Sequence, residues 1–596
     1  MLEQLMPKKD IRLKDLLNKA AVSVCILVFM AVYTDSVNAG TLTALSSATY
    51  NGSNLLDKAH DVEVHGSGNI VVAGEWDDSD AKFALTILYD NNLNDIRYST
   101  YQVSSQATYG QGVTVDKDGN IFVCGYYLAS DWFTIKYDPD LSVILSSYAY
   151  DYSLGYSDKA FALAADSSGN VFVTGFKMDP SMDIEYLTVK YNNDLSSIPA
   201  TASYNGPSIG SSDIAYGIAV DSSDNVYVTG KINNGTDNDF FTIKYDNDLV
   251  AISSVSYSGT AGYNDVARDI AIDDAGNVYV VGHSSAVAGN DVDLVILKYD
   301  SNLSLIDSKI IDGIVDNRCA GYGIDIDFQG NIIIGGSYED SGNKGFFTAR
   351  YTSSLVMISS ATFNDVTDEE IYDVASDNTG NIYVTGYRGT SSKDTQEDYL
   401  TTKYNGLPVI NTVSPGQADQ GDALDVTVTG NNFLSAVTAS FSGTGINVNS
   451  VTVNSSSELV LGLVVSSDAL PGKRGLTLTN TDDGFYTQSA IFQIDSSGSG
   501  IVDDTGDVRV LGSEEGEGTV NPDEGDRALI YFKGSRPGKF SLKIFTLLGE
   551  LVYKDSRDNV SEGNFSWIPG NIATGIYIAH IKGPGIDKSK KIAILR

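Results

Sequence analysis

The stretch Gly276-Asn-Val-Tyr-Val-Val-Gly282 decides the fold of this chain, because six close copies of it occur elsewhere in the sequence. Each copy is a short run of β-branched and aromatic residues that starts at a turn and stops at a glycine, which is typical of a strand. The copies are spaced 50 to 55 residues apart, a period that indicates a solenoid, a propeller or an array. They occupy 68–74, 119–125, 169–175, 224–230, 276–282, 330–336 and 380–386.

Three further strands accompany each copy. The preceding strand ends in a turn of the form Asp-x-x-Gly-Asn, and Gly and Asn tolerate the positive φ of a tight hairpin. A third strand ends in Lys-Tyr-Asp or a close variant, and a fourth has the form Ser-Ser-x-x-Tyr. Four antiparallel strands in a unit of about 50 residues are typical of a propeller blade.

The position of the fourth strand predicts how the ring closes. Its first copy, around Tyr50, comes before the first hairpin, and no copy follows Tyr404. We therefore expect the segment from Thr43 to Gly52 to complete the last blade, which joins the two ends of the ring and leaves no long free edge. The repeats then form seven blades.

The repeat resembles a known bacterial family. Asp213 to Asp246 carries the pattern Asp-x-Ala-x-x-Ile-Ala-x-Asp-x-x-Gly-Asn-Val-Tyr-Val-Thr-Gly, followed by Phe-x-Thr-Ile-Lys-Tyr-Asp, almost letter for letter. This pattern is similar to the SBBP repeat family, and the resemblance covers Thr43 to about Leu407. It implies a seven-bladed β-propeller, here assigned to residues 40–406, and no single activity.

The first 39 residues are predicted to be a secretory signal peptide. Basic residues precede an apolar run from Ala20 to Tyr33, and Val37 to Ala39 fits the small-residue cleavage rule. The run is shorter than the ~20 residues that a membrane helix needs, so we expect a secreted or cell-surface protein with no transmembrane segment after cleavage. With 77 acidic and 39 basic residues, the net charge of -38 argues against binding nucleic acid.

Two smaller modules are predicted after the ring. Residues 407–494 contain Val413-Ser-Pro-Gly416 and Gly430-Asn-Asn-Phe433, and they resemble the immunoglobulin-like IPT/TIG domain. A Ser/Gly/Asp-rich linker, 495–507, follows. Residues 508–596 resemble the C-terminal sorting domains of type IX secretion cargo and the related hook-capping Ig-like domains, which implies contact with the secretion machinery. The predicted fold class is all-β, a seven-bladed β-propeller followed by two Ig-like β-sandwich domains.

The repeat register predicts candidate binding residues at the centre of the ring. Twelve residues before the repeat asparagine, five blades carry an acid: Asp57, Asp158, Asp213, Asp265 and Glu369. Eight residues before it, three blades carry one: Asp61, Asp269 and Asp373. Acids on one circle would favour weak calcium binding. The alternative is that they are solvated strand starts and turn caps, with no cofactor and no metal bound.

A second ladder consists of the cations that precede the tyrosine of the third strand. We expect each to reach an aspartate in a neighbouring turn, which is a structural role. Its members are Lys136, Lys190, Lys244, Lys298, Arg350 and Lys403.

No catalytic residue is predicted. The four histidines are scattered singly, the chain has no Gly-x-Ser-x-Gly or P-loop motif, and Cys124 and Cys319 are expected to be buried free thiols. Two hypotheses follow. The first is a non-enzymatic secreted or surface protein whose propeller rim contacts a protein, a polysaccharide or a surface. The second is an extracellular polysaccharide lyase or glycoside hydrolase that uses rim carboxylates.

Overall fold

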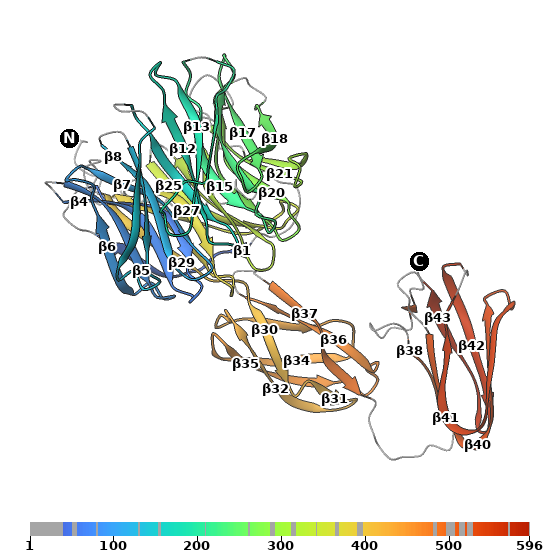
Figure 1. Cartoon of the computed structure of the whole chain (residues 1–596). Coiled ribbons are helices and arrows are strands. Elements are labelled where there is room, and N and C mark those ends of the chain that lie inside the picture. Colours follow the sequence, from blue (N-terminus) through green and yellow to red (C-terminus); the bar gives the residue numbers. More distant parts are fainter. Residues whose placement is uncertain are drawn as a thin grey trace, which may run out of the picture. The chain divides into compact units, whose positions relative to one another are not determined.

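The computed structural model describes most of the chain, and every regular element in the described residues is a β-strand (Figure 1). The expected all-β class is therefore confirmed, and no described helix is present that could cross a membrane. The expected signal peptide lies outside the described residues, as does the linker apart from Asp495 and Asp507. The described residues are 40–50, 56–78, 81–128, 131–152, 156–208, 210–259, 263–285, 292–311, 318–340, 343–363, 369–389, 397–480, 485–495, 507–511, 519–520, 528–569 and 573–594.

The chain divides into two compact units, 1–406 with 482–484 and 407–481 with 485–596. The described part of the first unit contains seven antiparallel sheets of four strands, and one of these carries an additional short strand. The first strands of the sheets are β3 (Lys58–Val64), β7 (Thr108–Val115), β11 (Lys159–Ala165), β15 (Ile214–Val220), β19 (Asp265–Ile272), β23 (Cys319–Ile326) and β27 (Glu369–Ser376). The second strands, which carry the repeat motif, are β4 (Ile70–Asp78), β8 (Ile121–Tyr127), β12 (Val171–Met178), β16 (Val226–Asn233), β20 (Val278–Ser285), β24 (Ile332–Asp340) and β28 (Ile382–Gly389).

The outer half of each sheet follows the same order. The third strands, which end in the repeat tyrosine, are β5 (Ala81–Tyr89), β9 (Asp131–Tyr137), β13 (Ile184–Tyr191), β17 (Asn238–Tyr245), β21 (Val292–Tyr299), β25 (Asn343–Tyr351) and β29 (Glu397–Tyr404). The fourth strands are β6 (Asp95–Tyr101), β10 (Ile144–Tyr150), β14 (Ala200–Tyr204), β18 (Ala251–Tyr257), β22 (Leu305–Ile311), β26 (Met357–Phe363) and β2 (Ala44–Tyr50). Neighbouring sheets pack face to face through apolar residues, as where Phe122 and Cys124 of β8 meet Val171 and Val173 of β12. Cys124 and Cys319 are buried and free, as expected.

The N-terminal strand closes the arrangement in the way the sequence predicts. Strand β2 pairs antiparallel with β29, with Ala44 opposite Tyr404, so it is the outer strand of the last sheet. Each first strand contacts the next along the chain, and β27 contacts β3. A further strand, β1 (Gly40–Thr41), pairs in parallel with β26 and was not anticipated from the sequence.

Local turn chemistry explains two recurring features of the repeat. In the hairpin between the first and second strands, Asp116 Oδ1 accepts the backbone N–H groups of Asp118 and Asn120 at 2.9 Å, and Gly119 has a φ of +84°. In the turn after the third strand, a leucine takes a φ between 53° and 65°, and its side chain is at most 6% exposed. Such a conformation is costly for a residue with a Cβ, so burial of the side chain offsets it. These leucines are Leu93, Leu141, Leu195, Leu249, Leu303 and Leu355.

Each of the six cations of the ladder joins its sheet to the next, and it binds an oxygen of that next sheet more closely than the expected aspartate. Lys136 Nζ donates to the backbone oxygen of Asn193, in the next sheet, at 3.0 Å, while Asp116 of its own sheet is 3.7 Å away. Lys403 of the last sheet donates to the backbone oxygen of Asn91 in the first sheet at 2.6 Å. The backbone carbonyls are the closer partners because the turn aspartates already accept amides of their own turn.

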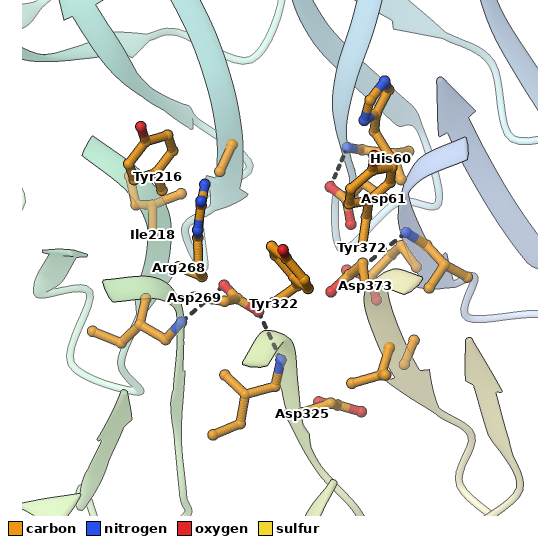
Figure 2. A pocket seen from close by; sticks show the side chains of 18 of the residues that line it. His60, Asp61, Tyr216, Ile218, Arg268, Asp269, Tyr322, Asp325, Tyr372 and Asp373 are labelled. Carbon is orange, nitrogen blue, oxygen red and sulfur yellow. Dashed lines mark hydrogen bonds between the residues drawn. The ribbon is translucent and has the colours of Figure 1, made fainter. Parts of the chain in front are cut away.

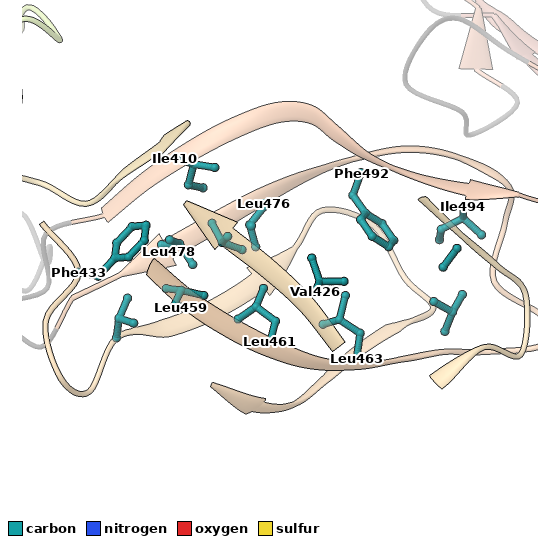
Figure 3. Packing of buried hydrophobic residues seen from close by; sticks show 14 of the residues in the cluster. Ile410, Val426, Phe433, Leu459, Leu461, Leu463, Leu476, Leu478, Phe492 and Ile494 are labelled. Carbon is teal, nitrogen blue, oxygen red and sulfur yellow. The ribbon is translucent and has the colours of Figure 1, made fainter. Parts of the chain in front are cut away.

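The second unit begins with two facing sheets whose side chains form one core (Figure 3). Val426 and Leu461 from one sheet pack with Leu476 and Phe492 from the other, and all four are at most 1% exposed. The first sheet contains β30 (Val409–Ser414), β32 (Ala423–Asn431), β35 (Glu458–Val465) and β34 (Ile446–Ser455). The other sheet contains β31 (Gln417–Asp419), β37 (Phe485–Asp495), β36 (Gly472–Thr479) and β33 (Thr438–Phe441).

The last module is a separate set of long strands around its own core. Phe532, Phe540, Phe565 and Trp567 are buried within it. The final strand carries exposed lysines and pairs in parallel with β39 at Ala593 and Ile594. Its strands are β38 (Asp507–Leu511), β39 (Thr519–Val520), β40 (Ala528–Thr546), β41 (Leu551–Trp567), β42 (Gly575–Gly583) and β43 (Ile586–Ile594).

The pairing of β2 with β29 predicts a cooperative loss of stability on N-terminal truncation. A chain that starts at Ser53 leaves β29 as an unpaired edge, so we expect the whole first unit to melt at a lower temperature than in a chain that starts at Gly40. Differential scanning calorimetry measures both midpoints. A chain without residues 508–596 is the control and should keep the midpoint of the first unit. Equal midpoints for the chains starting at Gly40 and Ser53 would contradict this closure.

Candidate functional site

The first strands of the sheets converge on a cavity of about 290 Å³. All seven of them contribute lining side chains, and Figure 2 shows several of these side chains meeting around one space. The lining is mixed, with tyrosines and aliphatic residues next to carboxyl groups and one arginine. Every repeat contributes side chains to this cavity, so we take it as the candidate site.

A β-bulge occurs at the same point of every first strand. In β19, for example, Ala267 lies opposite Gly282 and Asp269 lies opposite Val281, so Arg268 has no partner in β20. A bulge bends the strand and redirects the extra side chain, here into the cavity. We call the seven bulge residues the collar: His60, Gln111, Phe161, Tyr216, Arg268, Tyr322 and Tyr372.

One half of the collar consists of stacked rings held by a carboxylate. The imidazole of His60 stacks on Tyr372 with ring centroids 5.2 Å apart, and Tyr372 meets Tyr322 edge-on at 5.9 Å. The hydroxyls of Tyr322 and Tyr372 donate to the two carboxylate oxygens of Glu370 at 3.0 and 3.1 Å. Burial lowers the pKa of His60 to about 3, helped by the charges of nearby lysines, so this ring is neutral in the folded protein.

The other half of the collar is centred on a guanidinium. The Cζ atom of Arg268 lies 4.9 Å from the ring centroid of Tyr216 and 5.4 Å from that of Tyr322. Both contacts are within the range of a cation–π interaction. Tyr216 also packs against Phe161 at 5.4 Å. The collar is therefore a nearly continuous set of contacting side chains with a single positive charge between two tyrosines (Figure 2).

The three acids predicted eight residues before the repeat asparagine follow the collar directly and line the cavity. Each carboxylate accepts a backbone N–H group of the neighbouring first strand. The bonds run from Val113 N to Asp61 at 2.6 Å, from Ile324 N to Asp269 at 2.9 Å and from Val62 N to Asp373 at 3.0 Å. These aspartates thus join neighbouring sheets, between which the described residues make only isolated backbone contacts.

Close approach of the strands explains the glycines at the same register position. A Cβ on Gly323 would lie 2.6 Å from the Cα of Asp373, and one on Gly217 would lie 2.8 Å from the Cα of Asp269. Neither backbone position leaves room for a side chain.

The cavity holds carboxyl groups whose protons are retained to unusually high pH. Burial raises the pKa of Glu63 to about 8, that of Asp269 to about 7 and that of Asp325 to about 6. Asp61 and Asp373 hydrogen-bond to each other, and burial raises the pKa of both. Two carboxyl groups in contact share a proton, because their negative charges repel in a medium of low dielectric constant.

The five acids predicted twelve residues before the repeat asparagine do not line this cavity. Asp213, for example, accepts the backbone N–H groups of Gly206 and Asn233 at 2.6 and 2.7 Å. Asp158 and Asp265 bind loop amides in the same way. The structure thus uses Asp158, Asp213 and Asp265 to tie loops to the strand starts. All five acids are 0% exposed: Asp57, Asp158, Asp213, Asp265 and Glu369.

One of these acids belongs to a carboxylate cluster away from the collar. Single oxygens of Asp131, Asp151 and Asp158 lie within 4.8 Å of one another. Calcium takes about 6–8 oxygen ligands, so three carboxylates make only a partial set. Weak calcium binding by the ring stays a prediction.

Comparisons with known proteins agree with the repeat architecture. The family described as beta-propeller repeat, SBBP, matches residues 97–126, 206–237 and 255–286. Comparison with curated proteins finds no match to the chain. The chain is thus a β-propeller protein by its repeats and by its sheets.

Several solved structures are similar in fold at low identity. Sqt1 from Chaetomium thermophilum shares 11% identity with a TM-score of 0.36, over 66% of this chain and 98% of that one. The polysaccharide lyase Uly1 shares 9% with a TM-score of 0.38, over 62% and 93%. The calcium-binding protein regucalcin from Agrobacterium tumefaciens shares 12% with a TM-score of 0.30, over 50% and 91%. No activity is transferred from these likenesses.

The raised pKa of Glu63 predicts a pH-dependent stability. Between about pH 4 and about pH 8, the folded chain keeps a proton on Glu63 that the unfolded chain has lost. The contribution of the protonated group to the free energy of unfolding is therefore full below about pH 4, and it is lost as the pH rises towards about 8. Glu63→Gln removes the titration. We therefore expect its thermal midpoint, relative to the unsubstituted chain, to rise between about pH 5 and about pH 8.5.

The matched control for Glu63→Gln is Asp274→Asn, which replaces an exposed turn carboxylate. Its midpoint difference should be the same at both pH values. A difference for Glu63→Gln that does not change with pH would show that the side chain is ionised in the folded protein.

Proposed function

We propose that the first unit is a seven-bladed β-propeller that binds an extracellular ligand at the collar without transforming it, in a secreted or cell-surface protein. The observation that carries this proposal is the variation of the collar within the repeat. Seven repeats that agree in their packing residues supply His, Gln, Phe, Tyr, Arg, Tyr and Tyr at this one position. A purely structural position in a repeat would favour one residue type.

The position two residues after the collar is much less variable than the collar itself. Two residues after each collar residue, all seven repeats carry an aliphatic side chain that is at most 8% exposed. These residues pack between the sheets and vary only among Val, Leu and Ile. They are Val62, Val113, Leu163, Ile218, Ile270, Ile324 and Val374. Packing therefore constrains this position tightly, whereas the collar is free to differ from blade to blade.

The cavity also supports a second candidate, an extracellular lyase or hydrolase. A carboxyl group that titrates near neutral pH, as Asp269 does with a pKa of about 7, suits a general acid or base. However, both oxygens of Asp269 accept backbone amides, from Ile270 at 2.8 Å and from Ile324 at 2.9 Å. An oxygen that holds two strands together is poorly placed to exchange a proton with a substrate, so binding is the better supported function.

A glycan and protein array probed with the purified chain, residues 40–596, tests the binding function. We expect binding to a small set of ligands, and its loss in Tyr322→Ala and Tyr372→Ala, because these rings are held rigidly by Glu370. The matched control is Tyr98→Ala, which removes a tyrosine that is 58% exposed on the outer strand β6. Binding that survives both collar substitutions would place the ligand elsewhere.

Incubation with the ligands found on the array separates the two candidates. Chromatography of each bound glycan after incubation should show an unchanged chain length. Shortened products that disappear in Asp269→Asn would establish the enzyme instead.

For the rest of the chain, we propose that 407–494 is an IPT/TIG-like Ig domain that acts as a spacer and that 508–596 is a type IX sorting domain. The two facing sheets and single core of the first module support a β-sandwich. The separate core of the last module supports a domain that folds by itself. With 1–39 as a signal peptide, the protein would cross the inner membrane and then reach the surface.

Deletion of 508–596 tests the sorting role in a host with a type IX secretion system. The truncated chain should accumulate in the periplasm, while calorimetry shows an unchanged melting of the first unit. Fractionation and surface protease accessibility measure its location. Normal surface display of the truncated chain would remove the sorting role and leave an Ig-like module.

A further inference from the structure

Several basic side chains lie near Arg268 on the same and the adjoining sheets. Arg268 belongs to the collar, while Lys231 and His283 lie on the second strands of neighbouring sheets, β16 and β20. Arg318 lies directly before β23 of the next sheet. Their charges act on one another, because Arg268 lowers the pKa of Lys231 after burial, and Arg268 and Arg318 lower that of His283 to about 3 after burial.

Within the described residues, Arg268 forms no ion pair, and its buried Nε atom has no hydrogen-bond acceptor. Several other cations of the first unit form ion pairs. Lys58 contacts Glu397 at 2.7 Å and Lys177 contacts Glu185 at 3.2 Å. In a chain of net charge -38, a partly buried guanidinium without a carboxylate is unexpected, since an uncompensated charge is costly to bury.

The geometry of Arg268 indicates which group would satisfy it. Tyr216 and Tyr322 lie beside the guanidinium, and neither ring accepts its N–H groups in the plane of the guanidinium. A guanidinium edge matches a carboxylate, which accepts two parallel hydrogen bonds.

The rest of the cavity limits what can carry this carboxylate. Asp269, Asp325 and the Asp61–Asp373 pair line the space beside Arg268. Carboxyl groups repel a second anion, but they donate to and accept from hydroxyl groups. A ligand with one carboxylate and several hydroxyls therefore fits better than an acidic peptide. The volume of about 290 Å³ is near the lower end of ligand pockets, about 300–1,000 Å³, and suits a single sugar unit.

We infer that this cavity binds a uronic acid unit of an acidic saccharide, with Arg268 on its carboxylate and the carboxyl groups of the cavity on its hydroxyls. The inference rests on the proposed binding function and names its ligand class. Gln111, on the opposite side of the collar, is a further partner for sugar hydroxyls, since its amide both donates and accepts.

Isothermal titration calorimetry of residues 40–596 with a galacturonate trisaccharide tests the inference, with a neutral galactose trisaccharide as the matched probe. We expect binding of the uronate alone, weakened by added salt, and weakened about tenfold or more in Arg268→Gln. Arg268→Lys should recover only part of the affinity, because a lysine lacks the planar fork. Arg97→Gln, on the outer strand β6, is the matched control and should bind normally.

Each other outcome overturns a defined part of the inference. Uronate that does not bind, or that binds Arg268→Gln as tightly as the unsubstituted chain, removes the subsite. A short polyglutamate peptide that binds equally well and depends on Arg268 replaces the saccharide by a peptide ligand. Binding of neutral glycans alone keeps the proposed function and rejects the uronate, whereas an array without any ligand rejects the function itself.

A folding control keeps this experiment decisive. Thermal melting should show that Arg268→Gln unfolds at the same temperature as the unsubstituted chain or above it, because the substitution removes an unpaired charge. If Arg268→Gln does melt early, Gln111→Leu replaces it and should also weaken uronate binding, because Gln111 lines the same cavity. Full affinity in Gln111→Leu under those conditions would overturn the subsite.

Discussion

The ring depends on hydrogen bonds that side chains make to the backbone of the next sheet. Each sheet satisfies most of its backbone groups within itself, and only isolated backbone bonds, such as that from Asp213 to Ile184, cross between neighbouring sheets. Apolar packing between faces supplies most of the attraction but little angular specificity. Bonds such as those from Lys136 to Asn193 near the outer turns and from Val113 to Asp61 near the centre fix the positions of the sheets that they join.

The same bonds occur where the two ends of the chain meet. Lys403 reaches Asn91, and Val62 donates to Asp373, so the last and first sheets are joined by both kinds of side-chain bond. The pairing of β2 with β29 adds the strand that completes the last sheet. A ring built only from consecutive sheets would have its weakest contact here, and the displaced strand removes that weakness.

The sequence predicts the repeat and its strand order because hydrophobic periodicity and turn chemistry are local properties. It predicts the site less well, because a β-bulge leaves no clear local signal. The repeat register predicts Asp61, Asp269 and Asp373 as site residues. The collar lies one position before them, where the alternation of side chains in a regular strand would point Arg268 and Tyr322 away from the cavity. The loop amides that Asp213 binds cannot be predicted from spacing, because they depend on the path of the loop. The sequence indicates the collar only through the variation of the residue type at this position among the repeats.

The channel acids combine two roles that oppose each other energetically. Asp61, Asp269 and Asp373 join neighbouring sheets, yet burial raises the pKa of each, which is a cost to the folded state near neutral pH. A neutral hydroxyl-bearing ligand would lessen that cost without adding charge, whereas Arg268 needs an anion. A site of this kind favours a ligand whose charge is confined to one end, and it would bind less well as the pH rises and the acids ionise.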